Sequence, residues 1–345
     1  MSLHDEIHEQ PEVIERMLRS QVETAREIAA AIARRDVSGI LIAARGSSDN
    51  AALYGKYLWG SVSRLPVALA APSLFTTYRT PPRIAGLLVV GISQSGESPD
   101  IVSVVEEARR QGALTLAITN QPSSPLATEA ELVLDTATGP ERAVAATKTY
   151  TAQLAAIALL SAASQGDDRL LTELARVPEL MREMLALDES VRAAVERFRY
   201  MEQCVVLGRG FNYSTAHEWS LKLKELTYVV AEPYSSADFQ HGPVAIVSDG
   251  FPVLAVVPQG AVFEHVLQLL QTLAQEQRAE LVVLSNDDRA LALAQTPIRM
   301  PAELPEWVSP MVGIVPAQIF CYHLTRARGH DTENPRRLNK ITRTW

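Results

Sequence analysis

Residues 87–99 read LLVVGISQSGESP, and within these positions an apolar run gives way to small polar residues. Leu87–Ile92 has the length and composition of a buried β-strand, and the segment from Pro99 to Gln111 has the apolar periodicity of a helix. Ser98 can cap this helix, because Pro99 is favoured at the first helical position, where a missing N–H costs nothing. The stretch therefore predicts a strand, a Ser-rich turn and a helix in succession.

The same succession recurs along the chain. Ile40–Ala44 and Cys204–Leu207 each lead through a Gly-containing turn into a helical segment, Ala51–Trp59 and Ser214–Glu225 respectively. The strand at Leu87 likewise has a counterpart at Val253–Val257, and each is followed by a helix and a further strand. The offset between the copies stays near about 165 residues, as expected for duplication of a whole domain.

Short apolar strands that alternate with helices predict right-handed crossovers and a parallel sheet in each copy. We therefore expect an α/β fold of two tandem domains, each a doubly wound parallel sheet in a three-layer αβα arrangement. Residues 1–190 are predicted to form N-terminal helices and the first domain, and residues 191–345 the second domain and a C-terminal tail. The helical period of Glu6–Arg34 predicts an N-terminal extension that packs on the domain or on a partner subunit.

Composition limits the classes of partner. The formal net charge of −8 argues against a duplex nucleic-acid binder, whereas a small anionic ligand needs only a local positive site. The chain has no bilayer-spanning apolar run and its first residues lack the order of a secretory signal, so we expect a cytoplasmic protein. Cys204 and Cys321 lie far apart in apolar stretches, which predicts buried thiols.

The Ser-rich turn is the first candidate binding site. Ser93, Gln94, Ser95 and Ser98 follow a strand at the edge where ligands bind in open parallel sheets. Hydroxyls and free backbone N–H groups at a helix N-terminus suit a phosphate group. No Walker lysine is present and no strand leads into G-x-G-x-x-G, so nucleotide binding is disfavoured. An ordinary Ser-rich turn is the alternative.

Two further polar turns could contribute to the same edge. Gly46, Ser47 and Ser48 end the preceding strand, and Thr147 with its neighbours precedes a long apolar helix. Alone, the first turn is unspecific, and the second could be no more than a helix cap.

Candidate acid–base residues lie in the second copy. Glu218, Lys222 and Glu225 have the i, i+4, i+7 spacing that places them on one helix face, with Lys224 on another. A solvated salt-bridge ladder is the alternative interpretation of that face. His241 lies in a Gly-Pro-containing loop, where a histidine can titrate near neutrality but is more often only a surface residue.

The other histidines form no recognisable ligand set, so the sequence predicts no metal, and no cofactor is expected. The polar, Pro-containing segment 331–340 would be a disordered tail by composition.

Taken together, these stretches resemble the sugar-isomerase (SIS) domain family, specifically the isomerase half of glucosamine-6-phosphate synthase. The resemblance covers nearly the whole chain and rests on motifs that occur in the same order. These are Glu9-Gln10-Pro11, Ser93–Ser98, Ala146-Thr147-Lys148, Leu207–Gly210, Leu221–Glu225, His241-Gly242-Pro243 and Pro335–Lys340.

The resemblance implies flavodoxin-like SIS domains and a role for each motif. The sugar 6-phosphate would be held by Ser48, Ser93, Gln94, Ser95 and Ser98. Gly46, Ser47, Val144 and Thr147 would contact the substrate nearby. Glu225 would move a proton between sugar carbons C1 and C2, supported by Glu218 and Lys222. His241, supplied by the neighbouring subunit of a homodimer, would help to open the ring, and Lys340 at the carbonyl end could form an imine.

The 345 residues hold no counterpart of the glutaminase domain that supplies ammonia to the synthase. We therefore expect the deaminating direction, from glucosamine 6-phosphate and water to fructose 6-phosphate and ammonia. Two enzymatic alternatives stay open, a fructosamine-6-phosphate deglycase and an isomerase of another amino-sugar phosphate. A non-catalytic sugar-phosphate sensor is disfavoured, because no basic DNA-binding module is evident and all three catalytic-type residues are present.

Overall fold

The computed structural model describes residues 2–340, and its contacts divide the chain into two compact units. The amino-terminal unit consists of Glu9–Glu141, Ala146–Arg176 and the chain from Asn339. The carboxyl-terminal unit consists of the chain up to His8, Arg142–Ala145 and Val177–Leu338. The contacts thus divide the polar helical stretch at Arg176, and the expected domain boundary after residue 190 stays a prediction.

The amino-terminal unit is built on a five-stranded sheet in which every pair of neighbours is parallel. Its strands are β1 (Gly39–Ala43), β2 (Val67–Leu69), β3 (Leu87–Ser93), β4 (Leu114–Thr119) and β5 (Leu132–Asp135), in the order β2-β1-β3-β4-β5. Its helices are α2 (Gln10–Ala33), α3 (Gly46–Ser63), α4 (Ser73–Thr76), α5 (Pro99–Arg110), α6 (Pro125–Glu129), α7 (Lys148–Gln165) and α8 (Asp168–Ala175).

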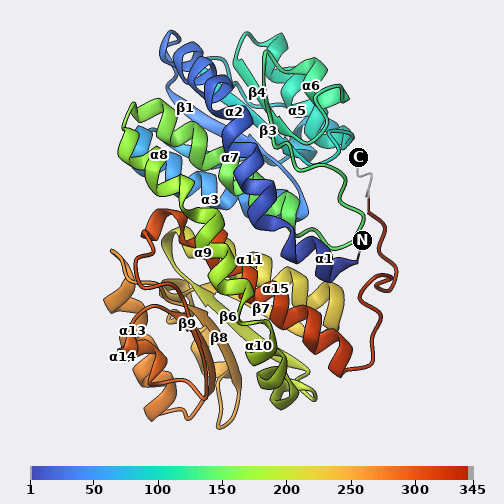
Figure 1. The fold of residues 1–345 in the computed structure, drawn as a ribbon. Helices are drawn as coiled ribbons and strands as arrows, with labels where there is room; N and C mark the ends of the chain where they lie inside the picture. Colours follow the sequence, from blue (N-terminus) through green and yellow to red (C-terminus); the bar gives the residue numbers. More distant parts are fainter. Residues whose placement is uncertain (1, 341–345) are drawn as a thin grey trace. The chain divides into compact units, whose positions relative to one another are not determined.

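Helices cover both faces of this sheet (Figure 1). Alternate strand residues such as Val89 and Ala117 pack against Val104 and Val105 of α5, as the period of a strand requires. On the other face, α3 and α7 contact the strands, and α2 packs along α7. The helical extension predicted over Glu6–Arg34 is therefore mostly α2, and it packs on its own chain.

The carboxyl-terminal unit repeats this architecture. Its parallel strands are β6 (Gln203–Gly208), β7 (Val230–Ser235), β8 (Pro252–Val256), β9 (Glu280–Ser285) and β10 (Thr296–Arg299), in the order β10-β9-β8-β6-β7. Its helices are α1 (Leu3–His8), α9 (Val177–Leu185), α10 (Asp188–Val195), α11 (Tyr213–Lys222), α12 (Ser236–Phe239), α13 (Phe263–Gln275), α14 (Asp288–Leu291) and α15 (Ser309–Ala327). Apolar residues of α13 and α14 cover one face of the sheet, and α11, which contacts α15, covers the other.

The two strand orders are the same when the second is read from β7, which confirms both the α/β fold class and the duplication. In each sheet the second strand pairs with one edge of the first strand, and the third strand pairs with the opposite edge of the first strand. The order reverses between β1 and β3, and again between β6 and β8. Such a switch point is where open parallel sheets bind ligands, beyond the carboxyl ends of the strands.

Two local differences from the sequence prediction affect the candidate site. The turn predicted at Gly46–Ser48 is the first turn of α3, which begins at Gly46 and not near Ala51. The helix predicted to continue to Glu225 ends at Lys222, and Leu223–Thr227 forms a π-helical turn. None of the helices in the described range 2–340 is long and apolar enough to cross a membrane.

Candidate active site

The Ser-rich loop lies at the switch point of the amino-terminal sheet, at the carboxyl end of β3. Ser98 occupies the N-cap of α5 with an extended backbone and Pro99 takes the first helical position, as predicted. The Ser98 hydroxyl makes no cap hydrogen bond within the described helix, which leaves it available to a ligand. Gly96 N–H donates to Ser93 Oγ at 3.1 Å and Glu97 N–H to Ser95 Oγ at 3.3 Å. The loop's own hydroxyls thus accept from these two N–H groups. The prediction that the N–H groups are free is wrong for both of them.

Gly96 is the residue on which the shape of this loop depends. Its φ of +64° lies in the left-handed region that favours glycine. A Cβ placed there would lie 2.0 Å from Ser124 Oγ, and the Gly96 carbonyl accepts from Leu126 N–H at 3.1 Å. The loop is therefore fixed against the N-terminus of α6.

The second group of polar residues at this switch point follows strand β1, at the N-terminus of α3. Ser48 lies in the first turn of α3, half-buried, and its hydroxyl accepts a hydrogen bond from Gln153 Nε2 of α7 at 2.9 Å. Arg45, the N-cap of α3, donates to the buried Asp100 carboxylate in the first turn of α5 at 2.8 Å. This ion pair joins the N-termini of α3 and α5, so Ser48 and the Ser-rich loop are held on adjoining helices.

Glu141 is a functional candidate that the sequence analysis missed. Its side chain is buried, and Oε1 accepts from the backbone N–H groups of Thr147 at 2.9 Å and Thr149 at 3.1 Å. Oε2 accepts from Lys340 Nζ at 2.5 Å. Burial opposes the charge on Glu141, but Lys340 and the two N–H groups outweigh it and hold its pKa below the usual value. The signal available in the sequence was an acidic residue directly after Gly139-Pro140 and six positions before Thr147 of the Thr-Lys motif.

The alternative interpretation of Thr147 as a helix cap holds for its position but not for its hydrogen bonding. It stands at the N-cap of α7, but its hydroxyl makes no cap hydrogen bond. Among the described residues, the buried Oγ1 atoms of Thr147 and Thr149 have no hydrogen-bond partner. Buried hydroxyls without partners cost free energy, so they favour a polar ligand at this turn.

Two of the predicted motifs meet in the core of the amino-terminal unit. Lys148 is buried and its Nζ donates to Glu9 at 2.7 Å. Thr151 Oγ1 donates to Gln10 Oε1 at 3.0 Å. Glu9-Gln10-Pro11 and Ala146-Thr147-Lys148 therefore fix α2 to α7, which is a structural role.

The carboxyl-terminal unit brings Glu218, Lys222 and Glu225 together, as predicted. The Lys222 side chain is buried, and its Nζ lies 3.5 Å from Glu218 Oε1 and donates to Glu225 Oε2. Glu218 is also buried, whereas Glu225 is partly exposed. Lys224 is exposed, on another side of the helix. This burial contradicts the alternative of a solvated salt-bridge ladder.

Glu225 lies in the π-helical turn that follows α11. π-helical turns inside or next to α-helices occur often at functional sites, because the extra residue redirects side chains. Here the turn ends at Tyr228, which has a positive φ of 60°. The result is a carboxylate anchored by a buried ammonium group and open on its other side.

Histidines in this unit differ in what they can do. His241 is exposed in the turn after α12, and its backbone N–H donates to Asp238 O at 3.0 Å. Burial lowers the pKa of His217 on α11 to about 4, so that ring stays neutral near pH 7. His241 is thus the better candidate for proton transfer in this stretch of the chain.

Val144 lies in a short segment held by α1. Glu6 is buried, and its carboxylate accepts from Arg142 N–H at 2.6 Å and Ala143 N–H at 3.1 Å. Val144 follows and is half-buried. The tail is also fixed: Glu333 accepts from Leu3 N–H at 3.1 Å, and Arg336 N–H donates to Tyr228 Oη at 2.9 Å. The composition-based expectation of a disordered tail over 331–340 is therefore wrong, because specific contacts order it.

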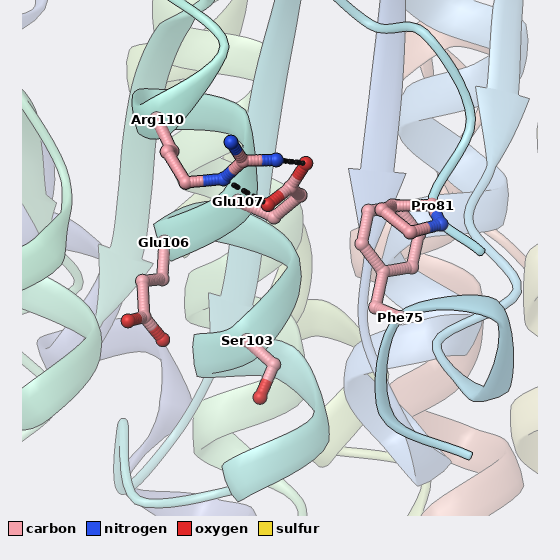
Figure 2. Close-up of a pocket in the computed structure, with 6 residues that line it drawn as sticks. All are labelled: Phe75, Pro81, Ser103, Glu106, Glu107 and Arg110. Carbon is pink, nitrogen blue, oxygen red and sulfur yellow. Dashed lines mark hydrogen bonds and ion pairs between the residues drawn. The ribbon is translucent and has the colours of Figure 1, made fainter. Parts of the chain in front are cut away.

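A hollow of about 250 Å³ lies elsewhere on the amino-terminal unit (Figure 2). Phe75 and Pro81 face the exposed side of α5 across it, and Glu107 and Arg110 form an ion pair on its wall. None of its lining residues belongs to the predicted site.

These features define a duplicated α/β protein with a polar, hydroxyl-rich switch point in one unit and a carboxylate–ammonium set in the other. The SIS domain family profile matches residues 35–163 and 198–327, which makes this chain a member of the SIS domain family.

Individual relatives agree with this assignment. A glutamine–fructose-6-phosphate aminotransferase (isomerizing) from Thermus thermophilus is 35% identical over 348 residues, covering 97% of this chain and 57% of that protein. This chain thus spans little more than half the length of such relatives, and it corresponds to their isomerase half.

Two solved structures match nearly the whole chain. A candidate phosphosugar isomerase from Silicibacter pomeroyi has a TM-score of 0.86 at 32% identity and covers 96% of this chain and 100% of that chain. The C-terminal domain of glucosamine-fructose-6-phosphate aminotransferase from Francisella tularensis has a TM-score of 0.86 at 29% identity and covers 96% and 98% respectively.

The Gly96→Ala variant tests the rigidity of the Ser-rich loop. The added methyl group would collide with Ser124 and would force a φ that alanine disfavours. We expect at least about tenfold weaker binding of a phosphorylated sugar, measured by calorimetry, because a displaced loop would lose the hydrogen bonds that its hydroxyls are predicted to make to the phosphate. Gly112→Ala, also at positive φ but in open space, is the control. Equal losses in the two variants would contradict a special role for the loop.

The Glu141→Gln variant tests what fixes the tail. Glutamine keeps Oε1 for the N–H groups of Thr147 and Thr149 but presents an NH₂ group to Lys340. A hydrogen bond to a charged group is worth about 1.5–3 kcal/mol, so tryptic cleavage in the tail should become faster by about tenfold or more. Glu131→Gln, at an exposed ion pair with Arg35, should leave the cleavage rate unchanged. An unchanged rate in Glu141→Gln would show that other contacts order the tail.

Proposed function

We propose that this chain is a deaminating aldose–ketose isomerase that converts glucosamine 6-phosphate and water into fructose 6-phosphate and ammonia. The observation that carries the proposal is the Glu225 carboxylate, anchored through Oε2 by the buried Lys222 ammonium group. The described residues give Glu225 Oε1 no hydrogen bond, so it can face a substrate. The relatives support this class of reaction, because their names describe enzymes that isomerize a hexose 6-phosphate.

Interconversion of an aldose and a ketose needs one base that moves a proton along one face of the sugar. In the open-chain substrate, Glu225 would take the proton from C2 while O1 gains a proton, which gives an enolamine, and would return it to C1 while the nitrogen loses a proton. The proton gained by O1 balances the proton lost from nitrogen. The product is a ketimine at C2, and water adds to it to release ammonia and leave the keto group of fructose 6-phosphate. The proton that Glu225 takes is the proton it returns, so the carboxylate is regenerated.

The remaining candidates have roles that their surroundings support. Ser48, Ser93, Gln94, Ser95 and Ser98 would hold the 6-phosphate at the α3 and α5 N-termini, where backbone N–H groups favour an anion. The Ser93 and Ser95 hydroxyls would then exchange their loop hydrogen bonds for bonds to phosphate oxygens. Lys340 Nζ donates to Glu141 in this arrangement, so imine formation would require it to leave that carboxylate.

The burial of both cysteine thiols favours the reaction direction that releases ammonia over the direction that consumes ammonia taken from glutamine. Hydrolysis of glutamine by a cysteine needs an accessible thiolate. Burial raises the pKa of Cys204 to about 12 and raises the pKa of Cys321 as well. Neither buried thiol is suited to attack glutamine, which favours a reaction that releases ammonia.

The Glu225→Gln variant tests the central assignment. Purified protein given glucosamine 6-phosphate without glutamine should release ammonia and fructose 6-phosphate in equal amounts. Glu225→Gln should lower kcat by at least about a hundredfold while the affinity for the sugar phosphate changes little, because only the base is removed. The exposed Glu276→Gln is the matched control and should retain full turnover.

Each other outcome has a definite meaning. Turnover of fructosamine 6-phosphate or of a galactose-series amino-sugar phosphate in place of glucosamine 6-phosphate would replace the substrate and keep the isomerase mechanism. Sugar-phosphate binding without turnover of any of these compounds would refute the enzyme and favour a sensor.

We further propose that the active unit is a homodimer in which each site takes His241 from the partner subunit. The exposure of His241 and of its loop supports this, since a ring-opening acid–base group must be shielded by something beyond its own loop. In such a dimer, Glu225→Gln in one subunit and His241→Asn in the other would put both changes in one site and leave the second site intact.

Mixing the two inactive variants therefore tests sharing of the site. Random reassociation should restore about one quarter of wild-type turnover, because half of the dimers are mixed and each contains one intact site. The mixture should stay inactive if each subunit supplies its own histidine, which would contradict the shared site.

A further inference from the structure

Three histidines surround one aspartate in the carboxyl-terminal unit, and none of the four is among the candidate site residues of the sequence. His4 and His8 come from α1, Asp188 begins α10, and His323 comes from α15. We call these four residues the His–Asp cluster. α1 and α15 are in contact, as are α10 and α15, so the cluster is where the three helices meet.

The ring nitrogens of all three histidines point at the Asp188 carboxylate. His4 Nε2 lies 2.7 Å and His8 Nε2 3.3 Å from Oδ2, and His323 Nε2 lies 2.6 Å from Oδ1. One ligand atom each from His4, Asp188 and His323 lies within 4.8 Å of the others. The i, i+4 spacing of His4 and His8 puts both rings on one face of α1, with their centroids 4.2 Å apart.

The hydrogen bond of His8 Nδ1 implies that a proton or a metal ion lies between His8 Nε2 and the Asp188 carboxylate. His8 Nδ1 lies 3.0 Å from the His4 carbonyl oxygen, which can only accept, so Nδ1 must carry the proton. In a neutral ring Nε2 is then a lone-pair acceptor, yet it faces a carboxylate oxygen. Two acceptors in contact repel each other unless a proton or a metal ion lies between them. A hydrogen bond from the remote nitrogen to a carbonyl is also how metal-bound histidines are commonly oriented.

We propose that the His–Asp cluster binds a divalent transition-metal ion, with Zn²⁺ as the ion that its ligands suit best. Three imidazoles and one carboxylate form a four-coordinate N₃O set of the kind that zinc accepts. At metal–ligand distances of about 2.0–2.1 Å, tetrahedral ligand atoms lie about 3.3 Å apart. The separations between Asp188 and the three histidines, 2.6–3.3 Å, therefore need to change by less than about 1 Å. The other separations among the ligand atoms of His4, Asp188 and His323, which all lie within 4.8 Å, need to shorten by at most about 1.5 Å, which side-chain rotation supplies.

The chemical state of the ligands is compatible with this ion. The Asp188 carboxylate already faces two ring nitrogens, His4 Nε2 at 2.7 Å and His323 Nε2 at 2.6 Å. Arg192, the nearby cation, is paired with Glu189 at 2.7 Å. His4 and His8 are about one third exposed, which gives an ion a path into the cluster.

All four ligands belong to the protein, so the ion would be structural and would fix α1. That helix already makes two long-range contacts: Glu6 holds the backbone of Arg142 and Ala143, and Leu3 N–H donates to Glu333. A metal ion that joins α1 to α10 and α15 would therefore stabilise the segment containing Val144 and the beginning of the tail.

The test is a titration of the untagged full-length chain, freed of metal with a chelator, with Zn²⁺ against a chromophoric competitor. We expect one Zn²⁺ per chain, and at least about tenfold weaker binding in Asp188→Asn and in His8→Gln. His265→Gln removes an exposed histidine of α13 and should bind Zn²⁺ as the wild type does. His8 is partly exposed, so its variant should fold even where Asp188→Asn does not.

Two further readouts decide between a metal ion and a proton. Co²⁺ bound at this site should show the intense visible absorption of a tetrahedral complex, and Zn²⁺ should raise the melting temperature of the wild type but not of His8→Gln. Failure of the wild type to take up Zn²⁺, or equal uptake by wild type and both variants, would overturn the proposal. Melting that depends on pH and not on Zn²⁺ would also overturn it and would identify a proton-linked network.

Discussion

Parallel pairing of every strand is the constraint on which the rest of this structure depends. Because the strands of each sheet run the same way, all their carboxyl ends meet at one edge, and each return path is a helix that begins there. Helix N-termini therefore gather where the strands end, and so do unpaired backbone N–H groups. The Ser-rich loop after β3 and the first turn of α3 lie at this edge because the topology permits no other place for them.

The second constraint is the cost of burying charge. A buried ammonium or carboxylate group is tolerated only with a partner, and removal of one partner leaves the other uncompensated. Lys148 with Glu9 and Lys222 with Glu218 meet this requirement inside the two units. The Glu9-Gln10-Pro11 and Ala146-Thr147-Lys148 motifs are thus joined by an ion pair that needs both of its members. Glu225 differs, because it shares the Lys222 partner but stays partly exposed, as the proposed proton exchange with a ligand would require.

The sequence predicted what depends on local periodicity. Strands β3 and β4 and helix α5, with Ser98 at its N-cap position, follow from apolar patterns within about 30 residues, and the duplication follows from comparing such patterns between the two halves of the chain. The contact of Glu141 with Lys340 could not be predicted, because 199 positions separate the two residues and no pattern links them. The same holds for Asp188 and His323, whose 135-residue separation hid a histidine cluster from a search for short ligand motifs. The π-helical turn at Leu223–Thr227 escaped prediction because the apolar positions of α11 continue through it.

Because the two units are copies of one fold, the loops at the equivalent edges of their sheets can be compared, and the polar groups of these loops differ. In the carboxyl-terminal unit the loop after β8 corresponds to the Ser-rich loop, but its Ala261 N–H donates to the Glu306 carboxylate at 2.8 Å. A Cβ at Gly260 would lie 2.2 Å from that carboxyl group, so the glutamate side chain fills the space against this loop. A carboxylate bound there repels a phosphate and occupies its donor. The loop after β8 therefore offers an anion less than the Ser-rich loop does, and the buried polar residues Glu218 and Lys222 of this unit lie on the body of α11. Under the proposed function, the amino-terminal unit would bind an anion at its helix N-termini, whereas the carboxyl-terminal unit would carry its proton-transfer group, Glu225, in the π-helical turn after α11.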